Sequence, residues 1–301
     1  MQQQIQAARA TLLVDSRNTL GEGATWCDAT GTLYWVDIEG ARLWRCRADG
    51  TGATHWPMPE RLACFALTDA PDVLLVGLAT HLAFFDLRTE TFTRIVDVEP
   101  ELPTRLNDGR CDSHGAFVFG MKDEGGEPPR AVGGFYRLNA DLTLERLALP
   151  PAAIANSIAF SPDGAKMYFC DSLVREIFVC DYRAGGDVAN VRPFARLTDA
   201  DGEPDGSTTD RDGGLWNAQW GGRRVVRYGP DGVETDRVAV PTAQPSCAAL
   251  DGDGRLYVTS ARVGLSDDAL AVDEHAGGVF VAQTRHAGLP TARFAGRAAS
   301  A

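Results

Sequence analysis

Four side chains that could ligate a cation recur at one position in this 301-residue sequence. Asn107, Asn156 and Asp205 each lie eight residues before a turn glycine, and Glu22 lies nine residues before its own. Carboxylate and amide oxygens are the ligands that hard divalent cations prefer. Asp and Asn also begin turns, so each residue alone is ambiguous. Four at one register predict a cation site, provided that the fold brings them together.

The elements that must position these residues recur six times along the chain. Each copy is a small turn, usually containing Gly, followed by a β-branched or aromatic run, and the copies are roughly 40–50 residues apart. The copies are GTLYWVDI, VLLVGLAT, GAFVFGMK, GAKMYFCDS, GGLWNAQW and GRLYVTSA, which begin at Gly31, Val73, Gly115, Gly164, Gly213 and Gly254. A strand-like run flanks each copy on both sides, and a weaker fourth run separates the units. This period predicts an all-β fold, a six-bladed β-propeller with four antiparallel strands in each blade.

A single propeller domain would use the whole chain, residues 1–301. Residues 11–16, TLLVDS, precede the first unit as a fourth-strand run precedes the third, so they are predicted to close the ring as the outer strand of the last blade. The segment TARFAG at 291–296 competes for that place. No helical pattern of the length that a parallel α/β fold requires separates the strands.

Composition excludes several classes of partner. The formal net charge is −12, from 29 basic and 41 acidic residues, which argues against nucleic acid and anionic membranes as partners. No apolar run approaches the roughly 20 residues that span a bilayer, and the first residues lack the pattern of a signal peptide. The seven cysteines are scattered, with no CxxC pair, as is typical of reduced thiols. A cytoplasmic protein is expected; its oligomeric state stays open, with a monomer favoured.

Several motifs, in order, give the chain a specific resemblance. They are LGEGATW, LYWVDI, RLNDGRCD, ANSIAFSPDG, EPDGSTTDRDGGLWNAQWGG and YVTSARVGLSDD, and they extend from Leu20 to about Phe280. On these motifs the chain resembles the senescence marker protein, regucalcin and gluconolactonase family of sugar lactonases, and is similar to its bacterial aldonolactonases that act on arabinono- and xylonolactones.

The resemblance implies roles for individual residues. Its metal ligands correspond to Glu22, Asn156 and Asp205, and its substrate contacts to Arg105, Asn107 and Glu124, with Asp123 as the alternative to Glu124. One divalent cation is implied, Ca²⁺ foremost, with Zn²⁺, Mn²⁺, Mg²⁺ and Fe²⁺ as alternatives. A cation can polarise a lactone carbonyl and acidify water. Either Asp205 or the cation itself would activate the attacking water, because a carboxylate bound to a cation is a weak base.

The expected activity is metal-dependent hydrolysis of a sugar lactone, such as an arabinono-, xylono-, galactono- or gluconolactone, to the free acid. The alternatives are a calcium-binding regulatory protein of the regucalcin type, a hydrolase of organophosphates or aryl esters, and a metal-free interaction propeller. The sequence has no GxSxG elbow, which argues against a serine hydrolase. None of the five histidines shares the register of the metal set, so structural or surface roles are expected for His55, His81, His114, His275 and His286.

Overall fold

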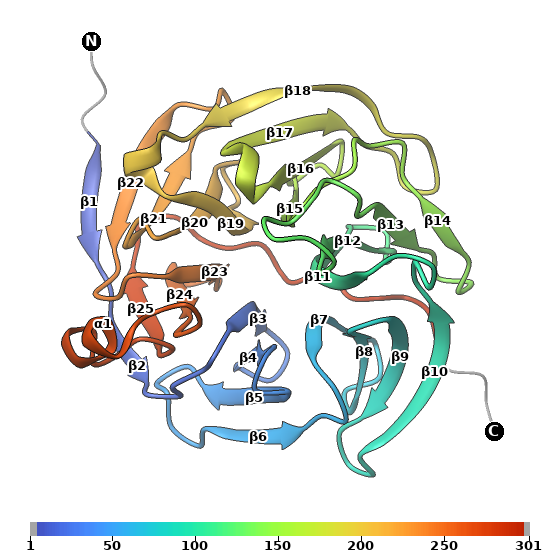
Figure 1. Cartoon of the computed structure of the whole chain (residues 1–301), viewed down its shortest axis with the longest axis horizontal. Helices are drawn as coiled ribbons and strands as arrows, with labels where there is room; N and C mark the ends of the chain where they lie inside the picture. Colours follow the sequence, from blue (N-terminus) through green and yellow to red (C-terminus); the bar gives the residue numbers. More distant parts are fainter. Residues whose placement is uncertain (1–4, 298–301) are drawn as a thin grey trace.

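The structure is a computed structural model that describes residues 5–297, and the expected domain span of 1–301 extends beyond it at both ends. Six small antiparallel sheets surround a central channel as the blades of a propeller, which confirms the predicted fold (Figure 1). Among the described residues the only α-helix is α1 (Asp267–Val272), with two short 3-10 turns, η1 (Ser172–Val174) and η2 (Asp199–Asp201). None of these helices is long and apolar enough to cross a membrane.

In each blade the strands follow one another from the channel outward. Blades one to three contain β3 (Gly21–Cys27), β4 (Thr32–Asp37), β5 (Arg42–Arg47) and β6 (Thr54–Pro57); β7 (Leu62–Leu67), β8 (Val73–Leu78), β9 (His81–Asp86) and β10 (Thr91–Asp97); β11 (Thr104–Cys111), β12 (Phe117–Asp123), β13 (Phe135–Leu138) and β14 (Leu144–Arg146). Blades four to six contain β15 (Ala155–Phe160), β16 (Lys166–Asp171), β17 (Glu176–Asp181) and β18 (Ala189–Arg196); β19 (Glu203–Thr209), β20 (Leu215–Trp220), β21 (Arg224–Tyr228) and β22 (Glu234–Ala239); β23 (Pro245–Leu250), β24 (Arg255–Ser260) and β25 (Val279–Gln283).

The N-terminal segment joins the two ends of the chain. Strand β2 (Thr11–Val14) pairs antiparallel with β25 as the outer strand of blade six. Strand β1 (Gln6–Arg9) pairs parallel with β22 and gives blade five a fifth strand, which the repeat pattern did not indicate. The N-terminal strands therefore bridge blades five and six through backbone hydrogen bonds.

Residues 284–296, here called the strap, cross the middle of the ring after β25 (Figure 1). The strap is bonded in turn to blades five, six, one, two and three, through Arg211 N–Ala287 O, Gly288 N–Asp251 O, Thr291 Oγ1–Trp26 O, Phe294 N–Leu67 O and Ala295 N–Gly115 O. The Phe294 ring, fully buried, lies 6.1 Å from the Phe84 ring. The segment TARFAG is thus part of a closure across the channel and not an outer strand.

The innermost strand of every blade carries a β-bulge near its start. The antiparallel register skips one or two residues in each strand: Gly23 and Ala24, Ala63, Asn107 and Asp108, Ser157 and Ile158, Asp205 and Gly206, and Ser246 and Cys247. A bulge bends its strand and re-aims the side chains beside it. The six strands begin at one end of the channel, here called the upper end, and finish at the lower end, which the strap closes.

Candidate active site

The residues predicted as ligands and substrate contacts meet at the upper end of the channel. A cavity of about 180 Å³ is lined by Glu22, Arg105, Asn107, Asn156 and Asp205. These residues come from β3, β11, β15 and β19, so four blades contribute to one site. Each lies in a bulge or within two residues before one. The repeated register in the sequence therefore corresponds to convergence in space.

Backbone conformation at the bulges is unusual in two motifs. Gly23 has φ of 61°, a left-handed conformation that glycine adopts without strain. Ser157 has φ of 60°, which is uncommon for a residue with a side chain. Its hydroxyl donates to the Asp205 carbonyl at 2.6 Å, across to the next blade. Such a conformation persists only where surrounding contacts hold it. Here the hydrogen bond to Asp205 holds the backbone next to Asn156 in place.

Glu22 and Asp205 face each other at the top of the channel. Burial raises the pKa of Glu22 to about 8, and the charge of Asp108 adds to the shift. Burial also raises the pKa of Asp205 well above its usual range, and the charge of Glu22 adds to that shift. The two carboxyl groups lie close enough for one, once protonated, to hydrogen-bond to the other. Without a compensating cation the pair of carboxyl groups therefore retains a proton at neutral pH.

Asp108 is a third carboxyl group in the channel, and the sequence reasoning did not assign it a role. It is 7% exposed, and its Oδ2 accepts a hydrogen bond from the Ile158 backbone N–H at 2.8 Å. Burial raises its pKa, while Arg110 opposes the shift. Asp108 stands in the RLNDG motif beside Asn107, and only the bulge shows that both side chains can face the channel.

Arg105 and Asn107 form the substrate side of the cavity. Arg105 is 1% exposed, and its Nη1 donates to Asn107 Oδ1 at 2.7 Å. Asn107 in turn donates to Asn156 Oδ1 at 3.1 Å. The Nε of Arg105 is buried without a hydrogen-bond acceptor among residues 5–297. A donor is thus available beside the metal-side residues.

Glu124 lies at the rim, next to Arg105. Its Oε1 is 3.4 Å from Arg105 Nε, and both of its oxygens accept hydrogen bonds from Arg61, at 2.5 and 2.7 Å. Partial burial alone would raise the pKa of Glu124, but the Arg61 hydrogen bonds outweigh it and the pKa is lowered. Arg61 directly precedes β7, the inner strand of blade two, which supplies no oxygen ligand. The sequence did not indicate Arg61, because an arginine does not fit the pattern of oxygen ligands.

Asp123 has a different environment. Its Oδ1 accepts from Gly125 N and its Oδ2 from Arg130 N and Nε, at 3.0, 2.8 and 3.1 Å. Hydrogen bonds from Arg130 lower its pKa. Asp123 therefore organises the loop after β12, and Glu124 is the carboxylate that faces Arg105.

The residues present fit a divalent cation. Glu22, Asn156 and Asp205 offer only oxygen ligands, as Ca²⁺ and similar hard ions require. Asp205 Oδ1 is buried and has no hydrogen-bond partner in the described part of the chain, a state that is unfavourable without a cation or a proton. A dication would satisfy this oxygen and the charge of both carboxylates together.

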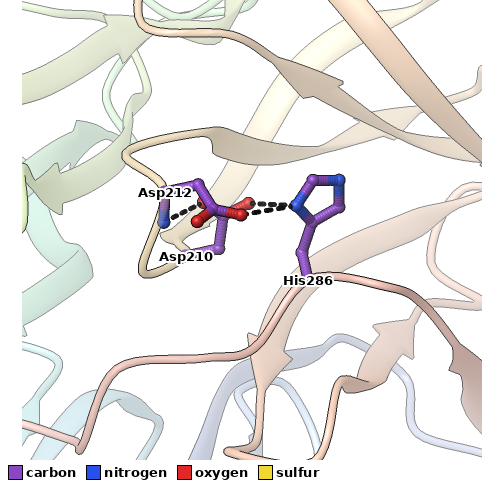
Figure 2. Close-up of side chains that lie close together, drawn as sticks. All are labelled: Asp210, Asp212 and His286. Atoms are coloured by element: carbon purple, nitrogen blue, oxygen red, sulfur yellow. Dashed lines mark hydrogen bonds and ion pairs between the residues drawn. The ribbon is translucent and has the colours of Figure 1, made fainter.

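A second acidic group, Asp210, Asp212 and His286, lies at the lower end (Figure 2). His286 reaches from the strap to Asp212, with 3.0 Å between Nδ1 and Oδ2. Asp210 already accepts hydrogen bonds from Arg227 Nε at 2.6 Å and Trp216 Nε1 at 2.8 Å. Because its oxygens are occupied by these donors, we assign this group to anchoring the strap and not to holding a metal.

Another cavity of about 180 Å³ lies at the lower end, above strap residues 289–292. Within residues 5–297, Arg110 is the only charged residue that lines it, and no carboxylate does so. Of these two cavities in the channel, only the upper one combines acids, amides and an arginine among the described residues.

Comparison with known proteins identifies the family of the chain. Residues 20–262 match the family described as the SMP-30/Gluconolactonase/LRE-like region. The chain belongs to this family. The resemblance found in the sequence motifs is thereby confirmed.

The relatives of the chain include sugar lactonases and regucalcins. It is 88% identical to the L-arabinolactonase of Azospirillum brasilense, over 98% of this chain and 99% of that protein. It is 33% identical to a pentonolactonase of Haloferax volcanii, over 83% and 84% of the two chains. A crystal structure of regucalcin, a calcium-binding protein from Agrobacterium tumefaciens, superposes with a TM-score of 0.89 at 29% identity, covering 96% of this chain and 98% of that one.

The raised pKa values of Glu22 and Asp205 predict how pH and metal act together on stability. A carboxyl group whose folded-state pKa is raised binds protons more tightly in the folded chain, so the free energy of unfolding of metal-free protein falls as pH rises from the ordinary 4.5 of Glu22 towards about 8. A bound cation removes this loss. A hundredfold excess of cation over Kd should add about 2.7 kcal/mol, or roughly 5–10 °C in melting temperature, and the gain should grow with pH.

Thermal melts with calcium or a chelator across this pH range measure the effect. Asp205→Asn should abolish the response to calcium, whereas Asp212→Asn, in the lower acidic group, should retain it. A response lost in Asp212→Asn and kept in Asp205→Asn would place the metal at the wrong end of the channel for this assignment.

Proposed function

We propose that this chain is a metal-dependent hydrolase of sugar-acid lactones, with a lactone of L-arabinonic acid as its substrate. The observation that carries the proposal is the single cavity that joins two raised-pKa carboxyl groups and Asn156 to the buried Arg105. The relative named L-arabinolactonase, at 88% identity over nearly the whole chain, supports this substrate. Glu22, Asn156 and Asp205 would hold the cation, which we propose to be Ca²⁺.

The chain's own residues account for the proton transfers of lactone opening. A bound divalent cation supplies Lewis-acid polarisation of the carbonyl and acidifies water. Asp205, whose Oδ1 is free of hydrogen bonds, accepts the proton that the attacking water loses, and returns it to the ring oxygen when the ester bond breaks. The negative charge of Glu22 raises the pKa of Asp205, which opposes the lowering of that pKa that a bound cation would cause. The products are a free hydroxyl and a carboxylic acid, which ionises to a carboxylate and releases one proton to solvent.

The substrate side of the cavity suits a ring with several hydroxyl groups. Arg105 Nε makes no hydrogen bond within the described residues, although it lies 3.4 Å from Glu124 Oε1, and Glu124 offers acceptors at the rim. Arg105 can also pair with the carboxylate that forms on ring opening, because a guanidinium donates in a planar fork. Leu20, Ile38, Ile154, Trp220 and Val263 also line the cavity. An aryl ester would not need the charged and amide groups beside them, so the presence of these groups favours a sugar lactone. A volume of about 180 Å³ suits a small ring.

A calcium-binding regulatory protein is the second candidate, favoured by the TM-score of 0.89 to the regucalcin structure. Binding of Ca²⁺ alone would require Glu22, Asn156 and Asp205 but not Arg105 and Glu124. The buried arginine beside the ligands therefore supports catalysis over simple binding.

A cytoplasmic location is part of the proposal. All seven cysteines are buried and free, as is usual for proteins of reducing compartments.

A panel of arabinono-, xylono-, galactono- and gluconolactones tests the function directly. With calcium present we expect hydrolysis, followed with a pH indicator, to be fastest for the L-arabinono-lactone, to cease on chelation and to resume when metal is returned. Calcium binding without hydrolysis of any lactone would contradict the lactonase function and favour the calcium-binding regulatory protein. Restoration by Zn²⁺ or Mn²⁺ but not by Ca²⁺ would overturn the choice of ion alone.

The two sides of the cavity should separate in variants. Arg105→Ala removes one charge-assisted hydrogen bond, so the enzyme should lose about 1.5–3 kcal/mol of transition-state stabilisation. This loss corresponds to a decrease in kcat/KM of roughly ten- to a hundredfold. The calcium stoichiometry should stay the same. Arg105→Lys should recover little, since an ammonium lacks the planar fork. Asp205→Ala should lose both metal and kcat. Loss of metal in Arg105→Ala, measured by elemental analysis beside steady-state kinetics, would contradict this division.

Glu124 and Asp123 form a matched pair of neighbouring acids. Glu124→Gln should raise KM several-fold with little change in melting temperature, because it weakens an acceptor at the rim. Asp123→Asn should lower the melting temperature, because it weakens the hydrogen bonds that order the 123–130 loop, and it should leave KM nearly unchanged. The reverse pattern in kinetics and thermal melts would assign the substrate contact to Asp123.

A further inference from the structure

A chain of hydrogen bonds begins at Arg105, passes through Asn156 and ends beyond the proposed metal ligands. Arg105 Nη1 donates to Asn107 Oδ1 at 2.7 Å, and Asn107 Nδ2 donates to Asn156 Oδ1 at 3.1 Å. Asn156 Nδ2 donates to Ser172 Oγ at 2.9 Å, and Ser172 Oγ donates to the Pro204 carbonyl at 2.8 Å. Every step is buried, and the last one ends at the residue before Asp205.

The two ends of this chain fix its direction. A guanidinium can only donate hydrogen bonds, so Asn107 must present its oxygen to Arg105 and its amide nitrogen to Asn156. A backbone carbonyl can only accept, so the Ser172 hydroxyl must donate to Pro204 and accept from Asn156. Asn156 lies between a donor and an acceptor, and only one of its two amide orientations satisfies both neighbours.

This orientation matters because the two faces of an amide differ towards a cation. The oxygen of Asn156 can ligate a dication, whereas its NH₂ group carries no available lone pair and would be repelled. Ser172 holds the NH₂ group away from the ligand position. It does so from a fixed place, because it is 4% exposed and its backbone N–H is bonded to the Ile154 carbonyl at 3.0 Å.

We propose that Ser172 is a positioning residue of the metal site: its hydroxyl fixes the amide orientation of Asn156 and so presents Asn156 Oδ1 to the cation. The inference rests on the proposed function, since it takes Asn156 as a ligand. It predicts that Ser172, which lines the same cavity but is not a proposed ligand, acts on metal affinity through Asn156.

The direct test is calorimetric titration of metal-free protein with Ca²⁺. Ser172→Ala should weaken calcium binding about 10- to 100-fold, the usual effect of losing a partner of a metal ligand. Ser172→Thr keeps the hydroxyl and should recover most of the affinity. Thr209→Val is the matched control: it removes another buried hydroxyl, which donates to the Phe160 carbonyl at 2.8 Å near the lower end of the same channel. That variant should bind calcium as the native protein does.

A second background separates positioning from general structural support. In Asn156→Asp either side-chain orientation presents an oxygen, so the added Ser172→Ala should change the calcium Kd by less than about threefold. A structural role for Ser172 would instead weaken binding equally in both backgrounds. Equal losses, or an unchanged Kd for Ser172→Ala in the native background, would overturn the proposal.

The native protein in the same titrations keeps this test apart from that of the proposed function. If native protein binds no calcium, the proposed metal site fails with it. If native protein binds calcium but hydrolyses no lactone, the enzyme assignment fails while the role of Ser172 is still decided by its variants. Should Asn156→Asp not fold, the Ser172→Thr arm decides: recovered affinity supports positioning, and affinity as low as that of Ser172→Ala overturns it.

Discussion

The rest of the site depends on two buried carboxyl groups, those of Glu22 and Asp205, that face each other in the channel. Charged carboxylates are strongly disfavoured in such surroundings unless a cation or a proton compensates them. Glu22 and Asp205 have no basic side chain bonded to them among the described residues, and Asp108 adds a third negative group nearby. The site is therefore suited to a dication, and its raised pKa values follow from burial and from the neighbouring negative charges.

The propeller scaffold makes this placement possible by bending each inner strand at the same point. An unbroken strand alternates its side chains between two faces, so neighbouring residues cannot both point into the channel. The bulges at Asn107–Asp108 and Asp205–Gly206 remove that restriction. Gly206 also permits a close approach of blade six, since a Cβ there would lie 2.6 Å from Cys247 Sγ. Bulges occur in all six blades, and four of them lie at or beside the proposed site residues Glu22, Asn107, Asn156 and Asp205.

The two ends of the channel differ in whether their carboxylates are paired with basic side chains. At the lower end the carboxylates are paired: Asp210 with Arg227, and Asp212 with His286. The Asp212–His286 pair fastens the strap, which joins five blades, whereas the Asp210–Arg227 pair lies within blade five. At the upper end the arginines do not neutralise the ligand carboxylates. Arg61 binds Glu124 instead, and Arg105 bonds to Asn107, so the acidic pair stays available for a cation.

The sequence alone determined the repeat, and with it the six blades, because four-strand units at a constant period have few other ways to bury their apolar faces. It also indicated Glu22, Asn107, Asn156 and Asp205, because pseudo-symmetry turns an equal register into a shared place in space. Family resemblance added Arg105 and Glu124. These predictions depended on local spacing, which a linear pattern preserves.

Only the tertiary structure decided the features that depend on contacts between blades. The structure distinguishes Glu124 from Asp123 because Arg61, which lies 63 residues before Glu124 in the chain, bonds to Glu124. The fifth strand of blade five and the course of the strap join the two ends of the sequence to distant blades. The orientation of the Asn156 amide depends on donors and acceptors in three segments, and the protonation of Glu22 on charges from two other strands. Such properties arise from long-range proximity, for which no periodicity of the sequence is a substitute.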